Sequence, residues 1–176
     1  NCGNVSVVYT QTITIIDTQA PTWTTAEGAL DVTLQCSDAS GLATAQSQAP
    51  VATDNCDATL TPVKSAGSFV AGTCPEEGTY TNTWTVTDCA GNVSAVYTQV
   101  ITIEDTQAPT WTTAEGALDI TLQCSDASGL ATAQSQAPVA TDNCDATLTP
   151  VKSAGSFVAG TCPEEGTYTN TWTVTD

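Results

Sequence analysis

Polar and apolar residues alternate most regularly in residues 79–87. Tyr80, Asn82, Trp84 and Val86 alternate there with five threonines. A period of two with β-branched residues on one face is typical of a strand that has one side in a core and the other in water. This segment therefore predicts a half-buried β-strand.

Two further segments show the same alternation. Residues 97–103 place tyrosine, glutamine and two isoleucines on one face, and the turn-forming residues 88–92 separate them from the first strand. These two strands therefore form a predicted β-hairpin. Residues 30–36 also alternate and predict a half-buried strand that opens the domain.

The remaining segments are less regular. Residues 39–49 could form one helical turn, but Gly41 and the nearby Pro50 disfavour a longer helix, so an irregular segment is expected. Residues 60–63 and 68–71 read as short strands. About seven short strands with almost no helix predict an all-β chain of immunoglobulin-like antiparallel β-sandwich domains.

The chain contains an internal repeat. Residues 17–88 recur as residues 105–176 with a single difference, Val32 against Ile120. Repetition at this period indicates tandem small domains that stack as an array.

The segment before the first repeat matches the end of a repeat, because residues 2–17 are similar to residues 89–105. We therefore expect residues 1–16 to be the last strand of a preceding or neighbouring repeat. Residues 17–104 then form a complete repeat, and residues 105–176 form a second repeat that lacks its last strand.

Two arrangements would supply the missing strand. In a long covalent array, a further repeat follows on the same chain, and the near-identity of the repeats favours this arrangement. In the alternative, pilus-like subunits polymerise when residues 1–17 insert as a donor strand into a neighbouring subunit. Both arrangements produce a filament.

Charge and composition exclude several function classes. The chain has 19 acidic residues, two basic residues and no histidine, for a net charge of −17. Nucleic acids and anionic membranes need clustered positive charge, so neither is an expected partner. Without histidine, the nucleophile-and-base pairs of acyl transfer cannot be assembled, and no enzyme activity is expected. No apolar run is long enough to insert into a membrane, and no cofactor is certain.

Eight cysteines recur at repeating positions without any Cys-x-x-Cys pair. This pattern favours disulfides over zinc or thiol-redox chemistry. Disulfides persist in oxidising compartments, so we expect an extracellular or cell-surface location.

Four motifs together resemble a known family. They are Asp-Thr-x-Ala-Pro at 17–21, Leu-Asp-Val-Thr-Leu-Gln-Cys at 30–36, Ala-Thr-Asp-Asn-Cys at 52–56, and Thr-Trp-Thr-Val-Thr-Asp-Cys-Ala-Gly-Asn-Val-Ser at 83–94. The repeat resembles the hyalin-repeat (HYR) type of domain, in the four-cysteine version found in large surface adhesins of Bacteroidota. The resemblance implies an immunoglobulin-like fold and an adhesive or structural role, and it implies no catalytic residues.

The topology of such a sandwich predicts the disulfides. Cys36 and Cys74 fall at the end of the domain away from its N-terminus, whereas Cys56 and Cys89 fall at the end where the repeat begins. The predicted bonds are Cys36–Cys74, Cys56–Cys89, Cys124–Cys162, and Cys2 with Cys144 of a neighbouring unit.

Acidic residues at the beginning of the repeat suggest a metal site. Asp54, Asp57 and Asp88 should approach one another near Asp17, and carboxylate oxygens at a domain junction suit calcium. The competing interpretation is that these residues form Asx turns and keep the surface soluble.

Two functions follow from these patterns. The first is a structural and adhesive repeat of an extracellular filament, whose partners are neighbouring identical repeats. The second is a recognition module that binds a surface glycan or another ligand through a sandwich end or the threonine face. Specific, saturable binding to a glycan array would favour the second.

Overall fold

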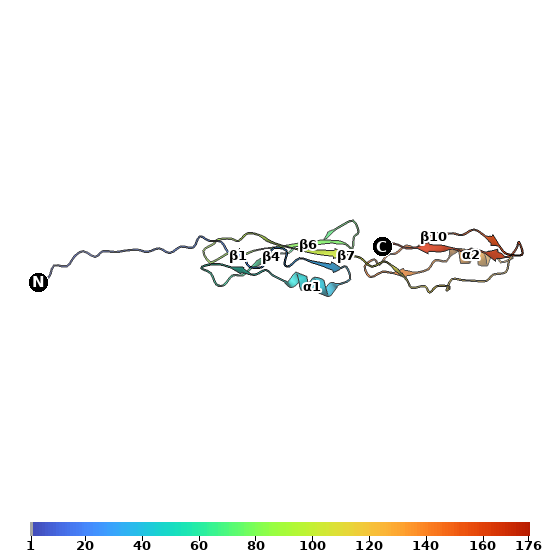
Figure 1. The fold of residues 1–176 in the computed structure, drawn as a ribbon, viewed down its shortest axis with the longest axis horizontal. Coiled ribbons are helices and arrows are strands. Elements are labelled where there is room, and N and C mark those ends of the chain that lie inside the picture. The colour runs from blue at the N-terminus through green and yellow to red at the C-terminus, as the bar shows by residue number, and fades with distance from the viewer. Residues whose placement is uncertain (1) are drawn as a thin grey trace. The chain divides into compact units, whose positions relative to one another are not determined.

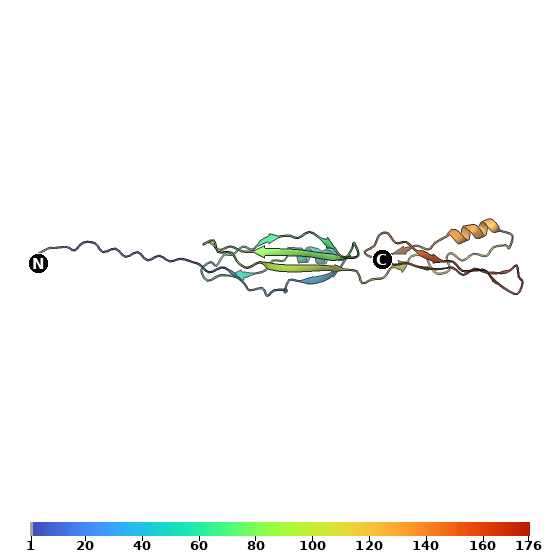
Figure 2. The same ribbon diagram turned by 90° about the horizontal axis from the view of Figure 1, so that it is seen from above.

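The residues predicted as a hairpin form two eight-residue strands, β6 (Gly78–Thr85) and β7 (Tyr97–Glu104). In the computed structural model these strands run side by side in opposite directions (Figures 1 and 2). The structure describes residues 2–176, and Asn1, the first residue of the predicted segment 1–16, lies outside the described residues. The prediction of a hairpin is confirmed.

Shorter elements complete each repeat. The first contains β1 (Thr22–Trp23), β2 (Val32–Gln35), α1 (Ala39–Ser47), β3 (Ala52–Thr53), β4 (Val63–Ser65) and β5 (Val70–Ala71). The second contains β8 (Thr110–Trp111), α2 (Ala127–Ser135), β9 (Ala140–Thr141), β10 (Val151–Ser153), β11 (Val158–Ala159), β12 (Gly166–Thr167) and β13 (Thr171–Thr173).

The strands of the first repeat form two sheets. One sheet has the order β2-β7-β6-β4, with β5 also paired to β6, and the other joins β1 to β3. The pairings of β4 and β5 with β6 and of β1 with β3 are antiparallel. The chain is all-β and its domains are immunoglobulin-like, as the alternation predicts.

The core of the first repeat lies between these sheets. Its apolar members with little or no exposed surface are Ala45, Trp84, Val86, Tyr97, Ile101 and Ile103. Two polar side chains, Asn82 and Gln99, are also fully buried. Trp23 closes one side of the core, since its ring packs edge-on against Tyr97 and its Nε1 donates a hydrogen bond to the carbonyl of Ala95 (2.8 Å). The alternating face of the hairpin is therefore the core face.

The structure corrects the interpretation of residues 39–49 as irregular, because α1 spans nine residues. Asp38 precedes the helix, and its Oδ1 accepts hydrogen bonds from the backbone N–H of Gly41 (2.8 Å) and from Ser40 (2.9 Å). A side chain at Gly41 would collide with Asp38 and crowd Leu34. The glycine thus allows the helix to pack closely instead of ending it.

Contacts divide the chain into two compact units that do not coincide with the sequence repeats. The first unit contains residues 1–32, 44–69 and 80–101, and the second contains residues 33–43, 70–79 and 102–176. The second unit therefore includes three segments of the first repeat, residues 33–43, 70–79 and 102–104, together with the whole second repeat. Among the described residues, no helix has the length and apolar character that crossing a bilayer requires.

Candidate functional site

The two copies differ in how well their core residues are covered. Asn82, Trp84 and Val86 are buried in the first repeat, whereas their counterparts Asn170, Trp172 and Val174 are partly exposed. The counterpart of Trp23, Trp111, is 41% exposed. We call these four residues of the second repeat, Trp111, Asn170, Trp172 and Val174, its open face.

The open face is the surface that β7 covers in the first repeat. In the first repeat β6 lies between β7 and β4, but β13, the counterpart within the second repeat, is paired with β10 alone among the described strands. One edge of β13 therefore presents unpaired backbone groups, which is the usual template for adding a strand.

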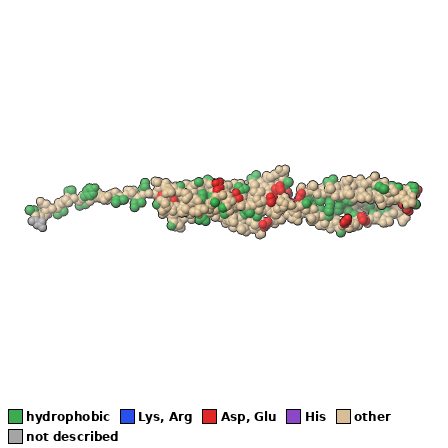
Figure 3. All heavy atoms as spheres, in the orientation of Figure 1, with side chains coloured by type: hydrophobic (Ala, Val, Ile, Leu, Met, Phe, Trp, Pro, Cys, Tyr) green, Lys and Arg blue, Asp and Glu red, His purple; other side chains and the backbone are tan. Residues whose placement is uncertain are grey.

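The N-terminal segment 2–17 has the sequence pattern that would fit this face. Its Tyr9, Gln11, Ile13 and Ile15 correspond to Tyr97, Gln99, Ile101 and Ile103, the buried face of β7. In the structure Tyr9 and Ile15 are each 91% exposed, and no described residue of this segment belongs to a strand. Figure 3 shows its hydrophobic side chains exposed to solvent along its length.

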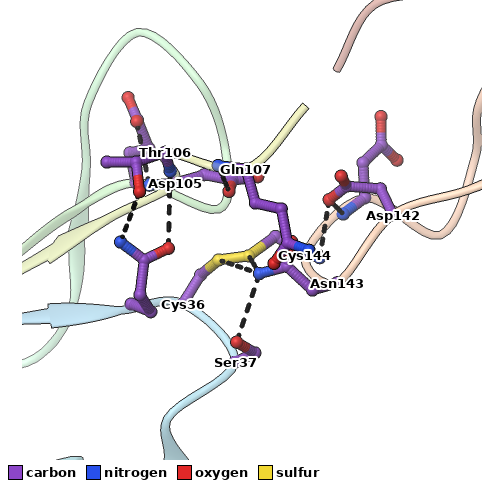
Figure 4. Close-up of a disulfide and its surroundings, with 11 residues drawn as sticks. Cys36, Ser37, Asp105, Thr106, Gln107, Asp142, Asn143 and Cys144 are labelled. Carbon is purple, nitrogen blue, oxygen red and sulfur yellow. Dashed lines mark hydrogen bonds between the residues drawn. A yellow bond between two sulfur atoms is a disulfide. The ribbon is translucent and has the colours of Figure 1, made fainter. Parts of the chain in front are cut away.

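The second unit contains a disulfide that joins the two repeats. Cys36, just after β2, is bonded to Cys144, which lies 108 positions later in the chain, and their Cα atoms are 5.8 Å apart (Figure 4). Cys36 reaches this place because its backbone N–H donates to the carbonyl of Glu104 (3.0 Å), which holds it at the end of β7. The bond therefore crosslinks the end of one repeat to the beginning of the next.

Hydrogen bonds surround this disulfide. Asn143 Nδ2 donates to Ser37 Oγ (3.2 Å) and lies close to both sulfur atoms. The amide of Gln35 donates to Thr106 Oγ1 (2.9 Å) and accepts from the Thr106 N–H (3.4 Å). Each of these contacts links a residue of the first repeat to a residue beyond its last strand.

One more contact comes from the loop that carries Cys74. Glu77 Oε1 accepts a hydrogen bond from the backbone N–H of Asp105 (3.1 Å). The segments around Cys36 and Cys74 therefore both lie in the second unit, next to the start of the second repeat. We call this set of contacts, made by Gln35, Cys36, Ser37 and Glu77 with Asp105, Thr106, Asn143 and Cys144, the repeat junction.

This pairing differs from the pairs predicted from sequence. Cys36 is bonded to Cys144 and not to Cys74, so the predicted bond of Cys144 to Cys2 of a neighbour is also replaced in this structure. The predicted bonds within a repeat join cysteines at the same end of that repeat. In the structure the beginning of the next repeat lies beside Cys36 and supplies Cys144 as its partner. The pairs Cys56–Cys89 and Cys124–Cys162 are not closed in the structure and stay predictions.

An acidic cluster lies at the beginning of the first repeat. One carboxylate oxygen from each of Asp17, Asp54 and Asp88 lies within 4.8 Å of the others. Asp17 Oδ1 accepts from the Gln19 N–H and Asp54 Oδ1 accepts from the N–H groups of Cys56 and Asp57. The Oδ2 atoms of Asp17 and Asp54 are buried and have no hydrogen-bond partner.

Asp57, the fourth predicted ligand, is not in this cluster. Its Oδ1 accepts from the Thr59 N–H (2.9 Å) and its Oδ2 accepts from the Cys89 N–H (3.1 Å). Asp57 therefore ties its own loop to the hairpin turn, which is the Asx-turn role that sequence analysis kept as the competing interpretation.

The second repeat repeats the cluster with Asp105, Asp142 and Asp176. Asp142 Oδ2 is again buried without a partner. Hydrogen bonds from the backbone, the strongest from Cys144, hold the pKa of Asp142 below its ordinary value although burial opposes them. The pKa of Asp88 is also lowered, because hydrogen bonds from Asn92 and the neighbouring backbone outweigh the opposing effect of burial. These carboxylates are therefore ionised at neutral pH.

The negative charge acts on a nearby cysteine. Burial and the carboxylates of Asp17, Asp54 and Asp88, together with the neighbouring Cys89, raise the pKa of the Cys56 thiol. Cys56 is therefore held as a neutral thiol beside the cluster. Its amide neighbour Asn55 donates to Cys56 Sγ (3.2 Å), just as Asn143 does to Cys144.

Three of the four aspartates predicted as metal ligands lie together in the structure, whereas the junction residues were not predicted. Gln35, Glu77 and Asn143 carry no motif of their own, and their role depends on which repeat ends meet. The available signal was positional, because each lies within a few residues of a cysteine that recurs in the second copy.

The comparison with protein-family models finds a similarity that covers most of the first repeat. Residues 24–103 match the model of the HYR-like domain with 4 cysteines. Neither the curated proteins nor the solved structures gave a match. Residues 112–176 repeat residues 24–88 of this matched region with the single difference Val32 against Ile120. Residues 24–103 are therefore similar to the HYR-like domain with 4 cysteines.

Proposed function

We propose that this chain is a structural and adhesive segment of an extracellular filament, in which HYR-like domains are joined by strand addition and by crosslinked junctions. It contributes length and mechanical stability and performs no catalysis. The resemblance to large bacterial surface adhesins supports a place on a bacterial surface.

The relation between the open face and the N-terminal segment carries this proposal. Residues 2–17 have the pattern of β7, and the open face is the surface that β7 covers in the first repeat. A copy of this strand would bury Tyr9, Ile13 and Ile15 against Trp111 and Trp172. Burying an isoleucine or tyrosine that is now exposed contributes about 1.5–3 kcal/mol of hydrophobic free energy for each side chain.

Hydrogen bonding fixes the register of this strand. In the first repeat Gln99 accepts from Asn82 and donates to the carbonyls of Leu30 and Ala45. In the second repeat Asn170 donates to Gln134 Oε1 (3.1 Å), and within the described residues it makes no bond like that of Asn82 to Gln99. Gln11 of the added strand would supply that partner, whereas a slip by one residue would turn the apolar face to water.

Assembly of purified protein tests the proposal. Ile13→Asp, on the face that would be buried, is expected to abolish filaments seen by electron microscopy and high-mass species in size-exclusion chromatography. Thr14→Asp adds the same charge on the opposite face and is expected to assemble normally. The proposal is overturned if both variants assemble as well as the unchanged protein, or if the unchanged protein stays monomeric at concentrations of about 100 μM.

The origin of the added strand is tested on native material. After boiling and reduction, subunits that exchange strands between chains would collapse to 18.0 kDa in electrophoresis. Repeats on one long polypeptide would instead remain as very large species. Either result is compatible with strand addition. The size of the reduced species shows whether the strand comes from another subunit or from a later repeat of the same chain.

A second candidate function, calcium binding at the acidic clusters, is favoured by one observation. One carboxylate oxygen from each member of a cluster lies within 4.8 Å of the others, and the Oδ2 atoms of Asp17, Asp54 and Asp142 are buried without a hydrogen-bond partner among the described residues. Like charges in this arrangement repel, and a hard divalent cation with carboxylate ligands would relieve the repulsion. Calcium there would stiffen the start of each repeat.

Isothermal titration calorimetry with calcium chloride tests this second candidate. Saturable heat in the unchanged protein and its loss in a variant carrying Asp54→Asn and Asp142→Asn are expected. No heat in the unchanged protein would leave the clusters as solvated turn residues.

A further inference from the structure

We propose that the Cys36–Cys144 bond is one instance of a repeating crosslink, and that Cys124 of one copy of this chain forms the same bond with Cys56 of the next copy. The inference rests on the proposed filament function and adds the identity of the partner surface and the covalent bond.

The repeat places an equivalent cysteine at each end of the chain. Cys124 is the counterpart of Cys36, and Cys56 is the counterpart of Cys144, each displaced by 88 positions. The structure shows both Cys124 and Cys56 exposed and free of a disulfide. The structure therefore contains one unbonded counterpart of each cysteine of the Cys36–Cys144 bond.

The other junction residues also recur at both ends. At the beginning of the first repeat Asp17, Thr18 and Asn55 correspond to Asp105, Thr106 and Asn143. At the far end of the second repeat the counterparts of Gln35, Ser37 and Glu77 are Gln123, Ser125 and Glu165. The latter three side chains are exposed in the structure, as are Thr18 and Asn55. Each group of three is thus half of a repeat junction.

These two surfaces are complementary to each other and not to themselves. At the formed junction Asn143 donates to Ser37, Gln35 pairs with Thr106, and Glu77 accepts from the Asp105 N–H. Between two copies the same contacts would join Asn55 to Ser125, Gln123 to Thr18, and Glu165 to the Asp17 N–H. A head-to-tail contact of this kind propagates without closing when its rotation does not generate a ring, which is how filaments form.

Formation of the bond is an oxidation and needs an electron acceptor. A small-molecule disulfide such as oxidised glutathione supplies it by exchange. The thiolate of one cysteine attacks the reagent and releases one reduced thiol, and the second cysteine then attacks the mixed disulfide and releases the other. Overall the two cysteine thiols lose two electrons and two protons, and the reagent disulfide is reduced to two thiols.

Cys89 is the competing partner for Cys56. The two residues are close enough for the charge of Cys89 to affect the Cys56 thiol, and the N–H of Cys89 is fixed by Asp57. Formation of Cys56–Cys89 within one repeat would remove Cys56 from the crosslink. The experiment therefore has to separate an intermolecular bond from this local one.

Variants of the whole chain make that separation. Reduced protein is exchanged into a glutathione redox buffer and examined by non-reducing electrophoresis, where a ladder of crosslinked multimers is expected. Cys124→Ser and Cys56→Ser should each abolish the ladder, whereas Cys36→Ser, which breaks only the bond inside the chain, should retain it. A ladder that persists in Cys124→Ser or in Cys56→Ser overturns the proposal.

Mixing the two inactive variants provides the control for folding. The Cys124→Ser protein retains Cys56 and the Cys56→Ser protein retains Cys124, so their mixture should give a crosslinked dimer and no longer species. Peptide mass spectrometry identifies the bond, because Val32 and Ile120 give the peptides of Cys36 and Cys124 different masses. A Cys56–Cys89 peptide in place of the crosslink would also overturn the inference.

Failure of the inference is distinguishable from failure of the proposed function. Assembly is measured in parallel by light scattering under reducing conditions, where no disulfide forms. Filaments under reducing conditions together with no ladder in the glutathione redox buffer would refute the crosslink and leave the filament function intact. Absence of filaments with and without oxidant would refute both.

Discussion

The side-chain amide of Asn82 donates a hydrogen bond to Oε1 of Gln99 at 3.0 Å, and neither residue has any exposed surface. The pair links β6 to β7 in the middle of an otherwise apolar core. A second acceptor, Gln46 Oε1, lies 3.1 Å from the same nitrogen, and the side-chain oxygen Oδ1 of Asn82 accepts from the Gly67 N–H (3.2 Å). A buried network of this kind favours one register, because any other leaves polar groups unpaired.

Replacing Gln99 by leucine should therefore destabilise the first repeat although it increases hydrophobicity. The change would leave the amide of Asn82 and the carbonyls of Leu30 and Ala45 with fewer partners. Each unsatisfied buried group costs about 1–3 kcal/mol. Urea unfolding monitored by tryptophan fluorescence measures the loss. Thr98→Ala, on the opposite face of the same strand, should cost much less, and equal losses would argue against the network.

The corresponding change in the N-terminal segment should affect assembly and leave folding unchanged. Gln11 is exposed in the structure and makes no contribution to the first repeat's core. If it supplies the missing partner of Asn170, Gln11→Leu should weaken strand addition by about fivefold to 100-fold, which corresponds to about 1–3 kcal/mol. A labelled peptide of residues 2–17 and its Gln11→Leu form can be compared by fluorescence anisotropy. Equal affinities would contradict the assigned register.

Calcium should raise the melting temperature if the aspartate clusters bind it. A ligand that binds only the folded state at 100 times its Kd adds about 2.7 kcal/mol of stability. Scanning calorimetry with calcium and with excess chelator should show this difference in the unchanged protein and a much smaller one in the variant carrying both Asp54→Asn and Asp142→Asn. Glu27→Gln, which removes an exposed acidic residue outside the clusters, should behave like the unchanged protein.

Acid should weaken the start of α1. Hydrogen bonds from the Gly41 N–H and then from Ser40 lower the pKa of Asp38 below 3.8. Because the folded-state pKa is depressed, the contribution of the carboxylate is present above 3.8 and is lost as the pH falls through the folded value. Asp38→Asn retains a capping oxygen that does not titrate. As the pH falls from 7 to about 2.5, the free energy of unfolding of Asp38→Asn should rise relative to that of the unchanged protein, as measured by denaturant titration. If the difference between the two proteins does not change with pH, Asp38 does not contribute to acid sensitivity.

Local patterns predicted the strands that have a continuous alternation. Residues 79–87 and 97–103 became β6 and β7 because each places large side chains on one face at a period of two. The strands expected at 60–63 and 68–71 are shifted, since β4 begins at Val63 and β5 at Val70. In these short segments, pairing with β6 determines the strand limits, and the sequence pattern carries too few residues to show it.

Features that depend on tertiary contacts could not be predicted in the same way. The length of α1 depends on the hydrogen bonds of Asp38 and on the close approach of Leu34 to Gly41. The partner of Cys36 depends on the next repeat, which is invisible to reasoning about a single domain. The aspartate cluster was largely predictable, because turns at the same end of a sandwich bring their residues together whatever the details of packing.

The bond between Cys36 and Cys144 also determines what a protease can do to the protein. The backbone between these residues and the disulfide together form a closed covalent ring. A single cut in any loop inside the ring, such as the loops around Cys56 or Cys74, leaves both fragments attached to each other. A second cut inside the ring would release only the segment between the two cuts, and separating the two flanking parts there requires a reductant, so a surface filament with this bond keeps its continuity after a nick.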